Sequence, residues 1–311
     1  MSDSNNKNGS SSVDQNPDVS EIRAETVVPP AADEVDLESD SPRHAEYTKR
    51  VVAFVDVLGF KEIIGRSAGD EELVRKIHNA LTVNNDAWAE VFAREVGLDM
   101  APDDFKDRMT SFSDCVVISV DPDIREIGLL VYIIFKISRQ LLRAGFLSRG
   151  GVAKGQLYHA DNTASRSTGT PMVFGPAFIS AYQFESTHAD GPRVILENSV
   201  REHIRRKCRD IRNSRLTAFL ETHIKRAEDG PAYIDIFADF GTSTYYEAAP
   251  DISSEVETIR AHICSALDQS ADRPLHFRKN AVLARQFNKA VQRAGWPRYV
   301  IDGELLPGKE G

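Results

Sequence analysis

The sequence predicts an α+β fold in which a central, mostly antiparallel sheet is flanked by helices, as in ferredoxin-like proteins. The order of the predicted elements indicates this fold class, and composition and length show that the chain can build a core of this size. Between about residues 50 and 190, apolar runs and helical patterns follow the order strand, helix, strand hairpin, helix, strand, helix. The apolar fraction of 41% is ordinary for a globular protein. The length of 311 residues is enough for one large domain or two small ones.

The N-terminal segment differs in composition from the rest of the chain. Residues 1–45 are rich in Ser, Asn, Asp, Glu and Pro and contain few large apolar residues, which predicts a disordered tail. Residues 46–311 are expected to fold, with a C-terminal helical elaboration of the same domain from about residue 192. In that elaboration we expect a strand at 232–240 and helices at 252–269 and 276–294.

The first part of the folded region has the clearest periodicity. "RVVAFVDVLGF" predicts a buried strand that ends in a glycine turn, and "FKEIIGRS" begins a helix. Apolar residues recur at helical spacing in segment 71–96. We expect a hairpin over 108–120, bent around Ser113 and Asp114, and then a helix over 124–144. A strand over 147–159 and a helix after "PMVFGP" complete this part.

Charge, cysteine usage and hydropathy limit the partners of the chain. A net charge of −9 would repel nucleic acid and anionic membranes. The three cysteines are widely spaced and form no CxxC pair, which suits a reducing, cytoplasmic compartment. The most apolar run, residues 127–135, is too short to span a bilayer. We therefore expect a buried helix there.

Two aspartates in apolar strands are the first functional signal. Asp56 and Asp114 each interrupt a strand-like run, and a lone buried carboxylate is costly. A shared Mg²⁺ or Mn²⁺ ion would neutralise both. The turn after Asp56 would also present the amides of Val57, Leu58, Gly59 and Phe60 at a helix N-terminus, where phosphate binds. This combination predicts a nucleoside triphosphate site, although a structural role for both aspartates is equally open.

Four segments, in this order, resemble motifs of the class III nucleotidyl cyclases. They are "FVDVLGFKEII" and "TSFSDCVVIS", which resemble the two metal-binding segments, "SRGGVAKG", and "FGPAFISAYQFES". Together they cover about residues 50–190. "DVLGFKEII", "FSDCVVIS", "RGGVAKGQLYH" and "VFGPAFISAYQFE" are similar to the bacterial Pycsar pyrimidine nucleotide cyclases, which make cyclic UMP or cyclic CMP in defence against phage.

The resemblance implies a fold, a reaction and a set of residues. It implies the class III cyclase fold and two divalent ions, Mn²⁺ or Mg²⁺, at a metal set of Asp56, Val57 and Asp114. The ions would assist attack of the ribose 3′-hydroxyl on the α-phosphorus. Arg149, the arginine of "SRGG", would pair with phosphate oxygens. Its alternative role is a surface ion pair.

The resemblance also implies a homodimer, because in this family each active site borrows residues from two domains. Segments 53–61 and 110–116 would come from one chain, and the helix that begins near Ala177 from the other. Since the sequence holds one copy of each segment, a homodimer with two equivalent sites follows.

The positions that select the base in the purine cyclases carry Thr110 and Met172 in this chain, and neither offers a purine partner. We therefore expect a pyrimidine substrate. The resemblance alone implies UTP, converted to 3′,5′-cyclic UMP, with CTP as the alternative and a separate effector that senses the product. Strand alternation puts Phe54 on the face of Asp56, and Arg108 and Thr110 on the face of Asp114. Phe54 is then either a base-pocket wall or plain core, and Arg108 either contacts a pyrimidine carbonyl or lies on the surface.

One departure from the family pattern leaves other functions open. The family's transition-state asparagine and arginine correspond to Ile179 and Gln183, neither of which supplies a positive charge. Either another basic residue replaces them or catalysis relies more on the metals. A catalytically silent nucleotide-binding homologue and a scaffolding domain with a structural aspartate pair are the competing hypotheses.

Overall fold

The computed structural model describes residues 46–82, 87–101, 108–160, 172–227, 230–242 and 252–306. All of them belong to one compact unit, Ala45–Gly311. The predicted disordered tail, residues 1–45, lies outside the described residues and stays a prediction.

In chain order, the described helices and strands are β1 (Thr48–Val57), α1 (Phe60–Ser67), α2 (Glu71–Leu81), α3 (Trp88–Val96), β2 (Met109–Phe112), β3 (Cys115–Val120), α4 (Ile124–Arg143), β4 (Ser148–His159), β5 (Val173–Phe174), α6 (Pro176–His188), β6 (Val194–Leu196), α7 (Asn198–Asp210), α8 (Ser214–His223), β7 (Ile224–Arg226), β8 (Ala232–Ile234), α10 (Ile252–Gln269) and α11 (Pro274–Arg293), followed by a 3₁₀ turn at Pro297–Tyr299.

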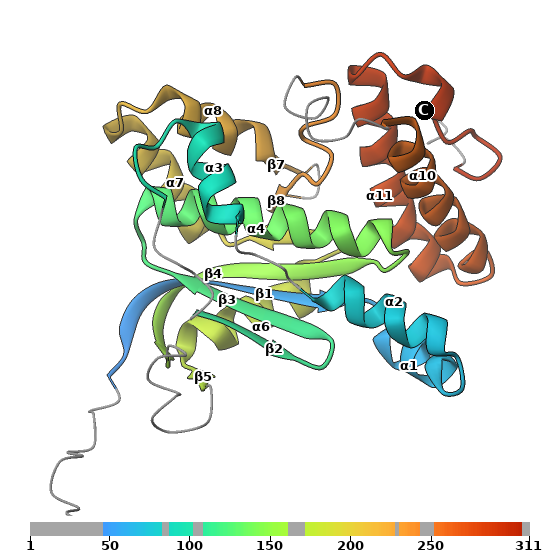
Figure 1. Cartoon of the computed structure of the whole chain (residues 1–311), viewed down its shortest axis with the longest axis horizontal. Coiled ribbons are helices and arrows are strands. Elements are labelled where there is room, and N and C mark those ends of the chain that lie inside the picture. The colour runs from blue at the N-terminus through green and yellow to red at the C-terminus, as the bar shows by residue number, and fades with distance from the viewer. Residues whose placement is uncertain are drawn as a thin grey trace, which may run out of the picture. The chain divides into compact units, whose positions relative to one another are not determined.

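The described strands form one mixed sheet of eight strands, so the chain is α+β as the sequence predicts (Figure 1). The main path runs β2-β3-β1-β4-β6-β8-β7, and β5 pairs with β4. Each described pairing is antiparallel except β4 with β6, which is parallel. The predicted hairpin is confirmed as β2 and β3, with Ser113 in its turn at a φ of 51°.

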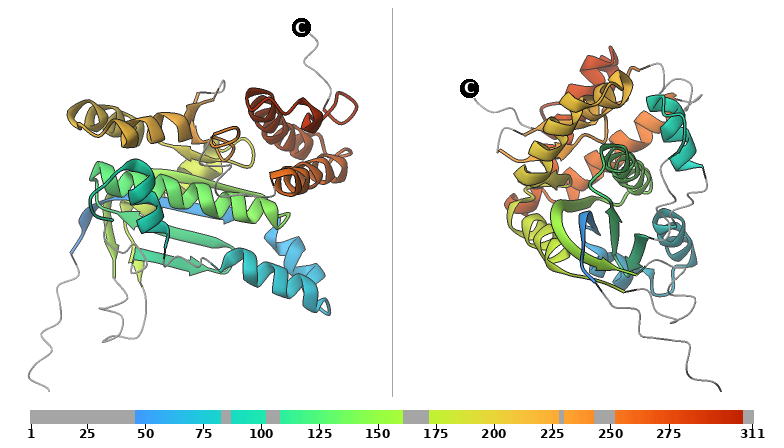
Figure 2. Two further views of the ribbon diagram at one scale, coloured as in Figure 1. Left: turned by 45° about the horizontal axis from the view of Figure 1, so that its top comes forward. Right: turned by 90° about the vertical axis from the view of Figure 1, so that its left-hand side faces the viewer.

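Strand β1 is central because it is apolar on both faces. Val51 and Val55 belong to the large core that packs under α4, whereas Phe54 and Ala181 of α6 belong to a second, smaller core. Helices α4 and α6 therefore cover opposite faces of the sheet (Figure 2). The run 127–135 lies inside α4 and is buried, as predicted. No described helix is long and apolar enough to cross a membrane.

The structure corrects two expectations for the C-terminal part. It is not only a helical elaboration, because β6, β8 and β7 extend the sheet from the edge of β4. The strand predicted over 232–240 ends at Ile234. There the Asp235 carboxylate accepts a hydrogen bond from the Phe237 amide at 3.0 Å, a local turn that competes with the strand ladder.

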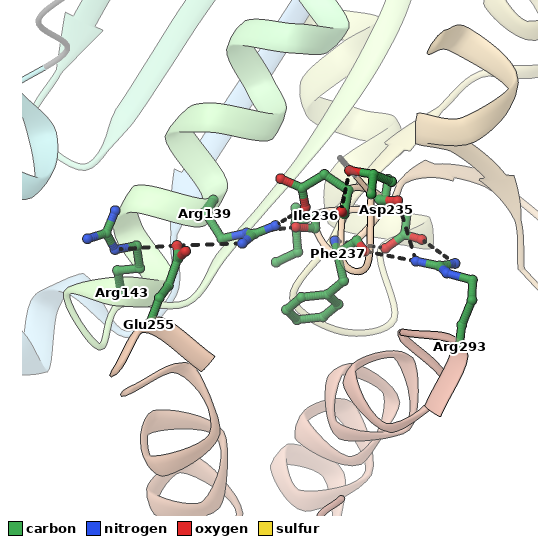
Figure 3. A network of polar contacts seen from close by, with 10 residues as sticks. Arg139, Arg143, Asp235, Ile236, Phe237, Glu255 and Arg293 are labelled. Carbon is green, nitrogen blue, oxygen red and sulfur yellow. Dashed lines mark hydrogen bonds and ion pairs between the residues drawn. The ribbon is translucent and has the colours of Figure 1, made fainter. Parts of the chain in front are cut away.

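Charged side chains join α10 to α4, and α11 to the turn after β8 (Figure 3). Arg139 of α4 donates from Nε to the Ile236 carbonyl at 2.9 Å and pairs with Glu255 of α10 at 3.5 Å. Arg293 of α11 donates to the Phe237 carbonyl at 2.9 Å. These contacts fix α10 against the C-terminal half of α4 and α11 against the turn after β8.

Candidate functional site

The end of β1 lies between the β2–β3 turn and the α4–β4 turn. The Val57 amide donates to the Asp114 carbonyl at 3.0 Å, and the Leu58 amide donates to the Leu147 carbonyl at 2.8 Å. Gly59 then adopts a φ of 70°, a left-handed conformation that costs glycine little, and α1 begins. The β2–β3 turn and the α4–β4 turn are thereby fastened to either side of the strand that carries Asp56.

These two hydrogen bonds correct one sequence-based expectation. Val57 and Leu58 were expected to present their amides to phosphate, but both amides are engaged by backbone carbonyls. Helix α1 has no side-chain cap, and the amides of Gly59, Phe60 and Lys61 have no partner among the described residues. The helix N-terminus can still receive an anion, but with this shifted set of amides.

The two predicted metal ligands lie close enough to influence each other. Asp56 pairs in the sheet with Cys115, the residue directly after Asp114. Burial, followed by the negative charge of Asp114, raises the pKa of Asp56. The same two causes, with a smaller contribution from Asp56, raise the pKa of the Cys115 thiol to about 11. The site therefore carries excess negative charge that a cation would relieve.

Arg149 lies on the other side of Asp56. The register of β1 against β4 places Arg149 directly opposite Asp56. Arg149 Nε lies 3.6 Å from Asp56 Oδ2 and forms a closer ion pair with Glu185 of α6. Sheet pairing thus brings together all three predicted catalytic residues, Asp56, Asp114 and Arg149.

Glu185 is the site residue that sequence reasoning did not single out. It is 1% exposed, and burial raises its pKa despite the opposing effect of Arg149. The available signal was the spacing of Ala177, Ala181 and Glu185, which places the carboxylate in line with two alanines on the buried side of α6. A buried glutamate in such a position requires a positively charged partner, here the side chain of Arg149.

The glycines of "RGGVAKG" explain why α6 lies so close to β4. A Cβ at Gly151 would lie 2.2 Å from the Ala181 carbonyl oxygen and 3.1 Å from the Glu185 amide. At Gly155 a Cβ would reach the Ala177 side chain at 3.4 Å. The absence of these side chains lets α6 rest on the sheet and deliver Glu185 to Arg149.

We expect Gly151→Ala to destabilise the protein by about 1–3 kcal/mol, because α6 must move to admit the methyl group. The matched control is Gly65→Ala on the exposed side of α1, where a Cβ meets nothing within 4 Å. That change should stabilise the protein by about 0.5–1 kcal/mol. Urea unfolding of both variants measures the two effects, and equal midpoints would contradict the close-packing argument.

The predicted base-contacting residues Phe54 and Thr110 lie on the α6 face of the sheet, Arg108 lies just before β2, and all three have partners of their own. The Phe54 ring packs edge-on against Phe178 and Tyr182 and is 7% exposed, which favours its role as core. Arg108 lies 3.3 Å from Asp121 and 3.9 Å from Glu126, within a charge cluster one residue before β2. Arg108 is therefore placed as a structural ion-pair partner rather than as a free donor.

Thr110 is linked to a histidine that the sequence did not flag. His159 Nε2 lies 3.0 Å from Thr110 Oγ1, and its Nδ1 lies 2.8 Å from Ser119 Oγ. Burial, with smaller contributions from Arg50 and Arg108, lowers the pKa of His159 from its usual value near 6.5 to about 4. The ring is thus neutral at pH 7, with one nitrogen donating and the other accepting.

This buried histidine makes stability depend on pH. Between about pH 6.5 and 4, the unfolded chain binds a proton at His159 that the folded chain does not, so stability falls as the pH falls through this range. Between pH 7 and pH 5 the free energy of unfolding of the wild type should fall by about 2 kcal/mol more than that of His159→Gln. Urea midpoints at the two pH values test this, with the exposed His78→Gln as control. Parallel losses in wild type and His159→Gln would contradict it.

The donor set fits hard divalent cations. No group of three His, Cys, Asp or Glu side chains suited to a metal occurs among the described residues, so a cation would rely on Asp56, Asp114 and backbone or substrate oxygens. Carboxylates with substrate phosphates are the usual ligands of Mg²⁺ and Mn²⁺. Burial and then the charge of Asp114 raise the pKa of Asp56, and a cation beside the two carboxylates would oppose both effects.

Comparison with known proteins gives no family for this chain, since no family model and no curated protein matches it.

Proposed function

We propose that the protein is a metal-dependent nucleotidyl cyclase of the class III type that converts UTP to 3′,5′-cyclic UMP and diphosphate. Its product would be a second messenger in antiphage defence, as the resemblance to Pycsar cyclases implies. The observation that carries the proposal is the convergence of Asp56, Asp114 and Arg149 at one end of three adjacent strands. Three segments that resemble successive cyclase motifs thereby meet at one place.

The topology of the first half of the chain supports the same family. Strands β1 to β4 are arranged as β2-β3-β1-β4 with antiparallel neighbours, and the helices α1 to α3 and α4 connect them in the order of a split βαβ unit. This is the order expected of a ferredoxin-like sheet. Asp56 lies where β1 ends, and Asp114 lies in the turn of the β2–β3 hairpin. A triphosphate could therefore bind at this end of the strands.

The roles of the chain's own residues follow from their positions. Asp56 and Asp114, with Val57, would hold the two divalent ions, which supply charge neutralisation and activation of the 3′-hydroxyl when bound. Arg149 would contact phosphate oxygens, and the α1 N-terminus from Gly59 would receive the outer phosphates. In the reaction the ribose 3′-oxygen bonds to the α-phosphorus, and the bond from that phosphorus to the diphosphate oxygen breaks.

The base would lie along the strands, away from the aspartates. Thr110 and Phe54 both pair with Val117 and so lie at the same level of the sheet. This level is two residues, or about 7 Å, from Asp56 along β1. The base of a nucleotide bound at Asp56 could extend that far. Arg108 lies about two residues farther and is paired with acids. Thr110, whose hydroxyl also lies 3.0 Å from His159 Nε2, is therefore the nearer of the two candidates for base contact. Its hydroxyl can donate to uracil or accept from cytosine, so cytidylate cyclase is the runner-up activity.

A catalytically silent nucleotide-binding homologue is the second candidate. It is favoured by the uncharged Ile179 and Gln183, both on the exposed side of α6. In a homodimer these two residues would face the site of the other chain, as the shared-site hypothesis requires.

A panel of the four ribonucleoside triphosphates with Mn²⁺, analysed by chromatography, tests the proposal. We expect a cyclic nucleotide from UTP, or from CTP for the runner-up. Nucleotide-dependent thermal stabilisation without product would establish the silent homologue. No product and no stabilisation with any nucleotide would leave the aspartates with a structural role and overturn the proposal.

A further inference from the structure

Arg149 is held by two carboxylates that differ in environment. Its Nε forms the close ion pair with Glu185, whose side chain is 1% exposed, and lies 3.6 Å from Asp56, whose side chain is 19% exposed. Arg149 Nε and Glu185 Oε1 are both shielded from solvent and have no hydrogen-bond partner among the described residues, so the contact between them is an ion pair. In both ion pairs the contacting atom of Arg149 is Nε.

The two carboxylates also differ in their freedom to move. Glu185 is fixed because α6 rests on Gly151, where even a methyl group would clash with the Ala181 carbonyl. Asp56 lies at the solvent-accessible end of β1, next to Asp114. A change at the site would therefore break the longer contact to Asp56 and leave the contact to Glu185 in place.

We propose that Glu185 is a positioning residue that anchors Arg149 through Nε and so leaves Asp56 available to a divalent cation. The inference rests on the metal site of the proposed function. Arg149 contacts both acids in the structure. Asp56 would hold the cation, and Glu185 would keep the guanidinium in place beside the phosphates.

The anchor has a thermodynamic consequence. If Arg149 lost Glu185, it would pair with Asp56 alone, and a cation would have to displace it from that carboxylate. The Glu185–Arg149 ion pair and cation binding are thus thermodynamically coupled. Each favours the arrangement in which Arg149 pairs with Glu185 and Asp56 binds the cation. Direct electrostatic attraction between Glu185 and the cation would depend on the charge of residue 185 and not on the length of its side chain. It therefore predicts that an aspartate at position 185 binds the cation as well as the glutamate does.

Glu185→Asp separates these two explanations. It keeps the negative charge but shortens the side chain by one carbon, about 1.5 Å. Mn²⁺ titrations of the full-length protein, followed by melting temperature and by calorimetry, give the metal affinity without a need for activity. We expect Glu185→Asp and Glu185→Gln to weaken Mn²⁺ binding about tenfold. Glu202→Gln, which alters an exposed Arg–Glu pair on α7, should leave binding unchanged.

The background variant Arg149→Met completes the test. Without the guanidinium there is nothing to anchor, so Glu185→Asp should change Mn²⁺ affinity less than about twofold in that background. Unchanged affinity in Glu185→Asp, or an equal loss with and without Arg149, would overturn the anchoring role while leaving the cyclase proposal intact. A wild-type chain that makes cyclic nucleotide but shows no Mn²⁺ binding would overturn the metal site and this inference with it. If Glu185→Gln does not fold, Glu185→Asp and Arg149→Met alone decide the outcome.

Discussion

Replacing Asp56 or Asp114 by alanine should abolish cyclic nucleotide formation. Each carboxylate would contribute to holding the ions that neutralise the triphosphate, and loss of such charge stabilisation is worth several kcal/mol, a rate loss of at least about a thousandfold. Chromatography of the reaction with UTP and Mn²⁺ measures the effect.

The fold should survive these substitutions. Burial and Asp114 raise the pKa of Asp56, so its ionisation at neutral pH costs the folded state free energy that Asp56→Ala removes. We therefore expect the melting temperature without metal to be unchanged or higher, and the Mn²⁺-dependent rise to disappear. Asp210→Ala at the exposed end of α7 is the control. Retained turnover in either site variant would rule out the assigned metal roles.

The strands and helices that could be predicted are those whose pattern is long enough to show a period. The ten residues of β1, the β2–β3 hairpin and the twenty residues of α4 were all predictable, because burial on one or both faces imposes apolar spacing on them. The strands β6, β7 and β8 have three residues each, too few for alternation to appear. Their place in the sheet is determined by contacts with β4 and its neighbours, which no local pattern encodes.

The candidate site was predictable to the extent that its residues are unusual locally. An aspartate within an apolar strand is conspicuous, which is why Asp56 and Asp114 could be found. A glutamate in a helix is ordinary, and Glu185 becomes significant only when Gly151 brings α6 against Arg149. His159 likewise acquires its role from β2 and β3, forty or more residues away in the chain.

In the predicted homodimer, helix α6 would contact the other chain through exposed side chains. Its buried stripe packs on its own sheet, yet Ile179 and Tyr182 on other sides of the helix are 52% and 51% exposed. These two large apolar side chains leave an exposed surface on α6 that a partner could cover. A second copy of the chain, placed head to tail, would cover this surface and bring Gln183 toward the other chain's aspartates.

Mixing two inactive variants should therefore restore activity. The first is Asp56→Ala, and the second is Gln183→Glu, which places a negative charge where it would face the triphosphate bound to the other chain. Gln183→Glu must first be shown to be inactive. In a mixed dimer one site combines the intact aspartate of one chain with the intact helix of the other, and the second site carries both defects. Random pairing makes half of the dimers mixed, so about a quarter of the wild-type activity should return.

The recovery depends on a site shared between chains, and it distinguishes that arrangement from a site completed within one chain. If each chain built its own site, mixed dimers would contain two defective sites, and activity would stay at the level of the parents. Mass spectrometry of the intact dimers confirms that mixed pairs have formed. Absence of recovery in confirmed mixed dimers, or full wild-type activity in a species that light scattering shows to be monomeric, would contradict the shared-site hypothesis. Ile179 and Gln183 would then be ordinary surface residues, and Asp56, Asp114 and Arg149 would have to act with groups from their own chain alone.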